Sequence, residues 1–579
     1  MFSSNKKALL TTLLAGTAAL TFAQKATVPN GWHLRDRKAD SLYGISLGKA
    51  YEFVKGRSSK TVLVAVIDSG IDTTHEDLRP ILWTNPKEIP GNGIDDDKNG
   101  YVDDIHGWNF IGGRDGRNVK EDSYEAARVF HAGKARFENA DPARLSKADQ
   151  ATYRDWLRAK EEVTEGTDPA QTVVLQKMLP MFLAGDSIIQ KDLGKAEYTA
   201  AELKTYKPTD MKATAVRGMI LQIAQANDNN FEIKNTELLE QLQGEIRKAD
   251  AATVAPRNYR GEIVKDNESD IKDRFYGNSD VMAGTPFHGT HVSGIIGAVR
   301  NNGKGIDGIA DNVRIMMVRA VPDGDEHDKD IALAIRYAVD NGAKIINMSF
   351  GKDFSPQKQW VDDAVKYAQS KGVLLVHAAG NDAKNVDTTY NFPTPIFVGG
   401  VKAPNWITVG ASGNPQAGGL AASFSNYGKK QVDVFAPGVN IYSTIPGGNT
   451  YGNASGTSMA APVTAGVAAF LLEYFPTLTP LQLKYVIENS AVPTNEMTAG
   501  PGVGEDVPFA SLSRTGGLVN AYEAAKLADA LVKGGGKIKT PAGKAKVDAS
   551  KVKVKNTTGK EKEKTEADKT KKKTEIKSF

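Results

Sequence analysis

Three runs of this sequence contain side chains that can carry out nucleophilic chemistry together. Asp68 directly follows the apolar run TVLVAVI, His288 lies in the run FHGTHVSG, and Ser458 lies in the run GTSMAAP. A serine hydroxyl is a weak nucleophile unless a neighbouring base takes its proton. A histidine can act as that base, and a carboxylate can hold the imidazole in the required tautomer. The pattern therefore predicts Ser458 as nucleophile, His288 as general base and Asp68 as the acid that orients it.

A fourth run, AAGN, ends in Asn381, whose side-chain amide can donate to a developing oxyanion. With Asp, His and Ser in this chain order, the sequence resembles the subtilisin-like serine peptidase family, the subtilases, over roughly residues 60–110 and 280–495. Secreted bacterial members are the most similar. The resemblance implies an oxyanion hole made by the Asn381 amide and the Ser458 backbone N–H, with His291 in a structural role.

Each run taken alone has a plainer interpretation. Asp68 can form a turn, His288 and His291 have the spacing of a metal-binding pair on a helix, and Ser458 can cap a helix. The four runs in this order favour the catalytic interpretation.

The resemblance also places a substrate cleft. Ser349, Phe350 and Gly351 are similar to the strand that pairs with extended peptide in subtilases, and Asn391 is similar to the floor of the primary specificity pocket. Neither run contains an acid, so we expect apolar or aromatic substrate side chains to be preferred.

A nearby loop borders the outer subsites in the family. Its acids either favour basic substrate residues or form a solvated surface; they are Asp323, Asp325, Glu326 and Asp328.

An acidic run, DDDKNGYVDD, predicts a structural calcium site. Oxygen-bearing residues alternate around a glycine at the sixth position, as in the first part of an EF-hand loop. The glutamate expected at position twelve is absent, because His106 occupies that place, so the site is not an EF-hand. The expected ligands are Asp95, Asp97, Asn99, the carbonyl of Tyr101, and Asp103 or Asp104. The alternative interpretation of this run is a polar acidic turn. Peptide-bond hydrolysis by the serine itself needs no cofactor.

The main departure from the family is the distance between the acid and the base, which are 220 residues apart. Between them, residues 115–275 have helical periodicity, as in the apolar faces 219–224 and 238–246. This insertion is either a surface decoration or a module that gates the cleft, inhibits it or binds a partner.

The beginning of the chain predicts export. Lys6 and Lys7 precede an apolar stretch, and cleavage after Ala23 would remove a signal peptide. We expect no other stretch long and apolar enough to span a membrane.

The composition and the C-terminal end give further expectations. The chain has no cysteine, so it forms no disulfide, and its net charge is +4. Its Lys-rich end predicts a disordered tail, and we expect no nucleic-acid partner.

Apolar runs alternate with helical stretches, which predicts an α/β fold: a subtilisin-like, three-layer arrangement around a mostly parallel sheet. The expected segments are a signal peptide (1–23), an N-terminal lead (24–59), the first part of a peptidase domain (60–114), the helical insertion (115–275), the rest of the peptidase domain (276–530) and the tail (531–579).

The sequence therefore predicts a secreted serine endopeptidase, periplasmic or extracellular, that hydrolyses polypeptides through an acyl-enzyme. Two alternatives remain open. One is a narrowly specific processing peptidase gated by the insertion, and the other is a calcium-binding, catalytically silent scaffold.

Overall fold

The structure is a computed structural model, and it describes residues 28–538 except for 166–168, 227–230, 232, 285 and 418. The predicted signal peptide and residues 539–579 of the predicted tail lie outside this part of the chain.

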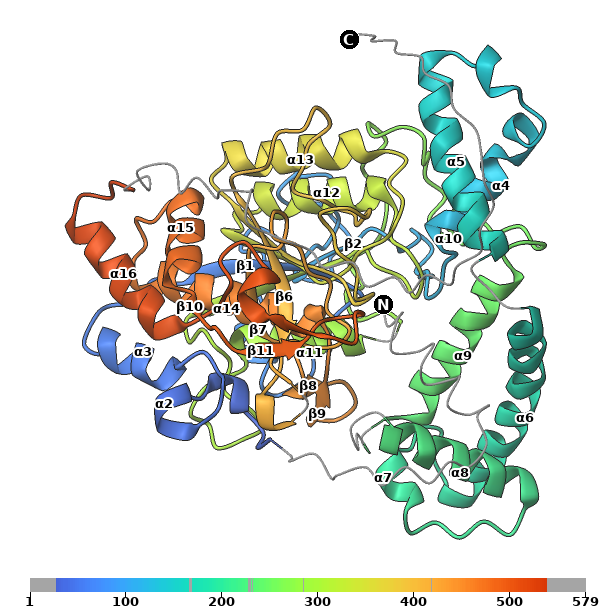
Figure 1. Cartoon of the computed structure of the whole chain (residues 1–579), viewed down its shortest axis with the longest axis horizontal. Coiled ribbons are helices and arrows are strands. Elements are labelled where there is room, and N and C mark those ends of the chain that lie inside the picture. The colour runs from blue at the N-terminus through green and yellow to red at the C-terminus, as the bar shows by residue number, and fades with distance from the viewer. Residues whose placement is uncertain are drawn as a thin grey trace, which may run out of the picture. The chain divides into compact units, whose positions relative to one another are not determined.

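A nine-stranded sheet forms the centre of the fold (Figure 1), with strand order β10-β13-β7-β6-β5-β4-β1-β3-β2. Every neighbouring pair is parallel except β10 and β13. The strands are β1 (Val62–Asp68), β2 (Gly107–Asn109), β3 (Val313–Arg319), β4 (Ile345–Met348), β5 (Leu374–Ala378), β6 (Trp406–Ser412), β7 (Val434–Pro437), β10 (Val492–Pro493) and β13 (Gly517–Leu518). Two hairpins lie outside the sheet, β8 (Ile441–Ile445) with β9 (Thr450–Ala454) and β11 (Met497–Ala499) with β12 (Asp506–Pro508).

Helices cover both faces of the sheet, which explains why its strands are mostly apolar. In β1, Val64 and Val66 belong to one hydrophobic cluster, whereas Ala65 and Ile67 belong to another. The first cluster also contains residues of α3 (Leu47–Val54), α11 (Phe287–Gly297), α14 (Thr457–Tyr474), α15 (Pro480–Ser490) and α16 (Ala521–Lys533). The second contains residues of α12 (Asp328–Asp340) and α13 (Lys358–Ser370). The predicted α/β class with three layers is confirmed.

The segment between β2 and α11 is helical. Its helices are α4 (Glu125–Phe137), α5 (Lys147–Glu165), α6 (Pro169–Leu193), α7 (Ala200–Leu203), α8 (Met211–Ala226), α9 (Asn235–Asp250) and α10 (Tyr259–Ile263). Helices α4 and α5 pack around Trp156, while α6, α8 and α9 share a separate cluster around Ile220. Leu157, which follows Trp156, is 41% exposed, because it lies outside the face that α5 buries against α4.

Within the described helices, Thr172–Leu193 of α6 is long and apolar enough to cross a membrane, by length and composition alone. By this measure, the expectation that no stretch after the signal peptide is long and apolar enough to span a membrane is wrong. In the structure, Leu175, Phe182 and Ile189 of α6 lie in the apolar cluster with α8 and α9.

A buried arginine at the end of β3 joins the loops around the carboxyl edge of the sheet. Arg319 is 2% exposed, and its guanidinium donates to the carbonyl oxygens of Ser69, Ala283 and Val119 and to Oδ1 of Asn109, over 2.6–3.1 Å. Burial lowers its pKa to about 10, so it remains charged at neutral pH. The planar fork thus links the loop after β1 to the beginning of the insertion.

We expect Arg319→Lys to destabilise the protein by about 2–4 kcal/mol, because one ammonium cannot satisfy four buried acceptors. Urea unfolding in a Ser458→Ala background would measure the change. Arg314→Lys, at an exposed position of the same strand, is the control. Equal unfolding midpoints for the two variants would contradict this role of Arg319.

Candidate active site

Asp68 and His288 meet at the carboxyl edge of the sheet. Asp68 is the last residue of β1, and His288 lies in the first turn of α11. Nδ1 of His288 is 2.7 Å from Oδ1 of Asp68, which also accepts the Ser69 N–H. Nε2 of His288 is buried and has no hydrogen-bond partner among the described residues. The carboxylate therefore orients an imidazole whose other nitrogen remains available as a base.

Ser458 lies in the first turn of α14. Its Oγ donates to the Ser349 carbonyl at 3.1 Å, and Oγ of Ser349 donates to the Ser458 carbonyl at 3.0 Å. The predicted nucleophile is thus bonded to the predicted substrate strand rather than to the imidazole of His288. A hydrogen bond between a candidate nucleophile and its base is often absent before substrate binds.

Asn381 is held in one orientation by the residue that precedes the serine. The N–H and the hydroxyl of Thr457 both donate to Oδ1 of Asn381, at 2.8 and 2.9 Å. The same hydroxyl accepts the Gly380 N–H at 3.1 Å. Because Oδ1 is engaged, Nδ2 is the group that faces the site.

The two predicted oxyanion donors lie close to the same point. A Cβ added to Gly456 would be 3.5 Å from Nδ2 of Asn381 and 3.6 Å from the Ser458 nitrogen. Gly456 is in extended backbone (φ 163°), which any residue can adopt. Its missing side chain leaves this point unfilled. Sequence analysis missed Thr457, although it directly precedes Ser458.

The predicted cleft residues come together in one pocket. Ser349, Phe350, Gly351 and Asn391 line a pocket of about 140 Å³ that Ser458 also lines. The edge of this strand continues at Lys352, which exchanges backbone hydrogen bonds with Phe392.

Of the acids in the bordering loop, Asp323 and Asp325 line this pocket, whereas Glu326 and Asp328 are buried. Asp328 lies 3.0 Å from the Lys352 ammonium, which also bonds the Glu326 carbonyl. The solvated-surface interpretation therefore does not describe these last two acids.

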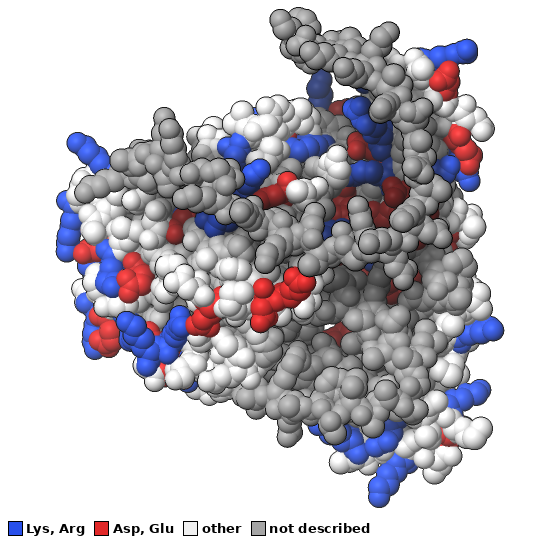
Figure 2. Space-filling view, in the orientation of Figure 1, with Lys and Arg blue, Asp and Glu red and all other residues white. Residues whose placement is uncertain are grey.

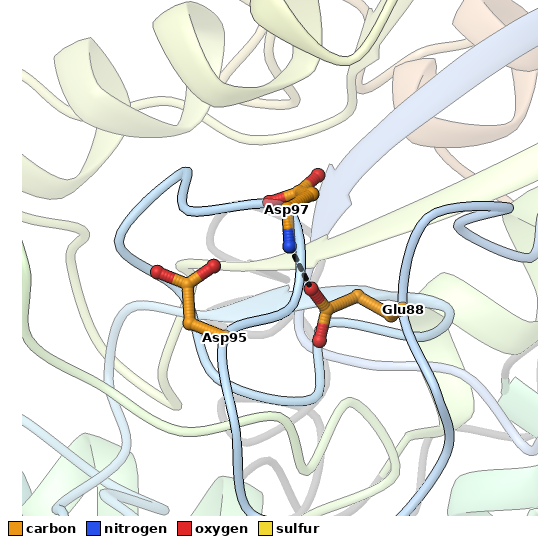
Figure 3. A group of neighbouring side chains, drawn as sticks. All are labelled: Glu88, Asp95 and Asp97. Carbon is orange, nitrogen blue, oxygen red and sulfur yellow. Dashed lines mark hydrogen bonds between the residues drawn. The ribbon is translucent and has the colours of Figure 1, made fainter.

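Two predicted calcium ligands lie together with a third acid that sequence analysis missed. Carboxylate oxygens of Glu88, Asp95 and Asp97 lie within 4.8 Å of one another (Figure 3). Oε1 of Glu88 also accepts the Asp97 N–H at 3.1 Å. The signal in the sequence that could have identified Glu88 is its position as an acid seven residues before Asp95.

The predicted ligands Asn99, Asp103 and Asp104 lie outside this group and accept hydrogen bonds within the protein. Asp103 accepts the N–H groups of Asn92 and Gly93, and Oδ1 of Asn99 accepts the Tyr101 N–H. Asp104 accepts hydrogen bonds from Asn85, Asn99 and the Tyr337 hydroxyl, and burial raises its pKa to about 6.

His291 does not form a metal pair with His288. Its Nε2 lies 3.2 Å from the Gly452 carbonyl, and burial lowers its pKa to about 4. The only group of potential metal ligands among the described residues is the acidic one above. The buried neutral ring fits the structural role that the resemblance implied.

Comparison with known proteins identifies the family. The model of the "Subtilase family" matches residues 59–516, so the chain belongs to the subtilase family. It is 47% identical over 188 residues to the "Thermophilic serine proteinase" of Bacillus sp. (strain AK1), covering 32% of this chain and 42% of that protein. It is 39% identical over 208 residues to "Subtilisin NAT" of Bacillus subtilis subsp. natto, covering 35% and 50%. It is 35% identical over 265 residues to the "Extracellular protease" of Xanthomonas campestris pv. campestris, covering 42% of each. The matches span half or less of each of these relatives.

The contact between Thr457 and Asn381 can be tested with an active-site label. Thr457→Val keeps the side-chain shape but removes the hydroxyl, so Nδ2 of Asn381 should lose its fixed direction. We expect the rate at which a fluorophosphonate labels Ser458 to fall about tenfold or more, since losing an oxyanion donor outright costs about 2.7–4 kcal/mol. Thr457→Ser, which keeps the hydroxyl, should label at close to the wild-type rate. Equal rates for both variants would show that the hydroxyl does not position Asn381.

Proposed function

We propose that this protein is an exported serine endopeptidase that hydrolyses polypeptides through an acyl-enzyme on Ser458. The observation that carries the proposal is the 2.7 Å contact between His288 and Asp68, which leaves the second imidazole nitrogen unpaired among the described residues, in a chain that belongs to the subtilase family.

The proposed reaction follows from the positions of these groups. His288 takes the Ser458 proton on Nε2 as Oγ attacks the scissile carbonyl, and Asp68 stabilises the imidazolium that forms. The oxyanion accepts hydrogen bonds from Nδ2 of Asn381 and the Ser458 N–H, at the positive N-terminal end of α14. The imidazolium then gives its proton to the leaving amine, and water hydrolyses the ester in the same way.

Digestion of casein tests the proposal most directly. We expect the wild-type protein to cleave casein, and Ser458→Ala to lower kcat by about 10⁴-fold or more, because the acyl-enzyme can no longer form. The thermal unfolding midpoints of both proteins should be compared, so that misfolding is not mistaken for lost chemistry. A folded wild-type protein that neither cleaves casein nor reacts with a fluorophosphonate would favour the silent scaffold.

A narrowly specific processing peptidase is the second candidate, and one observation favours it. Residues of the insertion, including Glu162 of α5 and Lys248 of α9, line the same pocket as Ser458. An enzyme of this kind would react with the fluorophosphonate but leave casein largely intact.

Export is supported by the n-region lysines and apolar stretch before Ala23, and by a relative named as an extracellular protease. N-terminal sequencing of protein recovered outside the cytoplasm should begin at Gln24. Recovery of the mature protein from the periplasm or from the medium would show in which of these two compartments it resides.

A structural calcium ion is a further part of the proposal. Glu88, Asp95 and Asp97 would hold it, since hard carboxylate oxygens suit Ca²⁺ and repel one another without a cation. The ion would stabilise the loop before β2 and take no part in the chemistry.

Calcium should therefore raise the stability of the folded protein. At about 100 times its Kd, we expect a gain of about 2.7 kcal/mol in the free energy of unfolding. Asp95→Asn and Glu88→Gln should each remove most of this gain, whereas Asp96→Asn, outside the group, should keep it. The measurement is urea unfolding of the Ser458→Ala protein with calcium or with chelator; a gain unchanged in Asp95→Asn and Glu88→Gln would refute this site.

A further inference from the structure

The pocket beside Ser458 is built jointly by the peptidase fold and the insertion. Its lining includes Ser458 and Asn381 on one side, and Glu162 of α5 with Glu245 and Lys248 of α9 on another. A polypeptide positioned for attack by Ser458 therefore also meets side chains of the insertion.

This pocket is strongly acidic. Seven carboxylates and two lysines line it. One of the lysines, Lys352, is already paired with Glu125 and Asp328 at 2.8 and 3.0 Å. Acidic side chains are visible in a recess beside the helices of the insertion (Figure 2).

Most of the carboxylates have a basic partner. The ion pairs are Glu240 with Lys120 (2.8 Å), Asp323 with Arg247 (2.7 Å), Asp353 with Lys384 (2.7 Å) and Glu245 with Lys248 (3.6 Å). Glu162 and Asp325 differ, since neither forms an ion pair with any described residue. The Asp325 carboxylate accepts the Glu125 N–H at 2.8 Å, and the Asp325 backbone carbonyl accepts a hydrogen bond from the Arg128 guanidinium at 3.1 Å.

The electrostatics of these two acids indicate a shortage of positive charge. The Glu162 side chain is exposed, yet partial desolvation by nearby protein, together with the charges of Asp353 and Asp325, raises its pKa to about 7. Burial also raises the pKa of Asp325. A cation placed near these two groups would lower the pKa of each carboxyl.

Lys248 shows that the pocket accommodates a cationic group. Its ammonium lies 4.3 Å from the centroid of the Tyr124 ring and 3.6 Å from Glu245. It remains half-exposed at the rim, so it screens the carboxylates without forming a close pair with Glu162 or Asp325.

We propose that this pocket binds a positively charged nitrogen group of the polypeptide substrate, with Glu162 and Asp325 as the residues that select it. The proposal rests on the proposed function, because it assigns substrate class to the same site. Acidic side chains alone do not define a binding site, but these line the pocket that contains the candidate nucleophile and Asn381. The group is the side chain of lysine or arginine, or the ammonium at the N-terminus of the substrate.

This selectivity differs from the apolar preference that the runs around Phe350 and Asn391 suggested. Those runs contain no acid. Five of the seven carboxylates that line the pocket come from α5, α9 and the loop at 323–325, and the other two are Asp353 and Asp382.

A series of fluorogenic peptides tests the proposal. Lysine is compared with norleucine, which has a similar shape but no charge, at each of the four positions before and the two after the scissile bond. Each peptide is prepared with a free and with an acetylated N-terminus, and kcat/KM is measured for each.

Wild-type protein should prefer lysine at one position, or the free N-terminus over the acetylated one, and the position identifies the source of the charge. Glu162→Gln and Asp325→Asn should each reduce this preference about two- to fivefold, as expected for a partly exposed ion pair. Lys248→Met should increase it, because a competing cation is removed. Glu161→Gln, the neighbouring exposed acid outside the pocket, is the control and should leave it unchanged.

Equal kcat/KM for lysine and norleucine at all positions, with no effect of acetylation, would overturn the proposal while leaving the peptidase function intact. An unchanged preference in both Glu162→Gln and Asp325→Asn would also overturn it. If no peptide of either series is cleaved and Ser458 is not labelled by a fluorophosphonate, the proposed function itself fails.

Discussion

The close packing of the first turn of α11 against the loop after β1 is the constraint on which the candidate site depends. A Cβ added to Gly289 would lie 2.1 Å from the Gly70 carbonyl oxygen and 3.2 Å from Cβ of Asp68. No side chain fits there, and only glycine lets helix and loop approach so closely. This approach brings His288 within hydrogen-bonding distance of Asp68, although 220 residues separate them in the chain. Arg319 stabilises the same edge of the sheet by joining the loop at Ser69 to the segments at Asn109 and Val119.

Buried charges attach the insertion to the peptidase fold. Arg260 of α10 pairs with Asp266 and with Asp330 of α12, and the carboxylates of both partners are fully buried. Lys352, beside the cleft, pairs with Glu125 at the beginning of α4. Such pairs contribute more to a defined geometry than to net stability, because desolvation offsets much of their attraction. They help to hold α5 and α9 beside the pocket next to Ser458, together with apolar contacts such as that of Phe354 in the cluster of α4 and α5. The cluster of α6, α8 and α9 is separate from the core of the sheet.

Several groups near Ser458 act through other residues. Thr457 holds the amide of Asn381, and Ser349 exchanges hydrogen bonds with Ser458 at the edge of the cleft. Asn347 in turn donates to the hydroxyl of Ser349 at 2.9 Å. Each of these side chains is short and buried, so its rotamers are few and its hydrogen bonds have one geometry. The donors are thereby oriented before a substrate arrives, which is the condition for effective oxyanion stabilisation.

The sequence by itself determined the α/β class, the main strands and the family, because buried parallel strands and runs such as GTSMAAP have strong local signatures. It also singled out Asp68, His288, Asn381 and Ser458 as candidates. Only the tertiary structure decided what depends on contacts between distant segments. It grouped Glu88 with Asp95 and Asp97, bonded Thr457 to Asn381, and placed Glu162 of the insertion in the pocket of Ser458. Spacing along a chain cannot predict such contacts, since they are set by how helices and loops pack across the whole fold rather than by local periodicity.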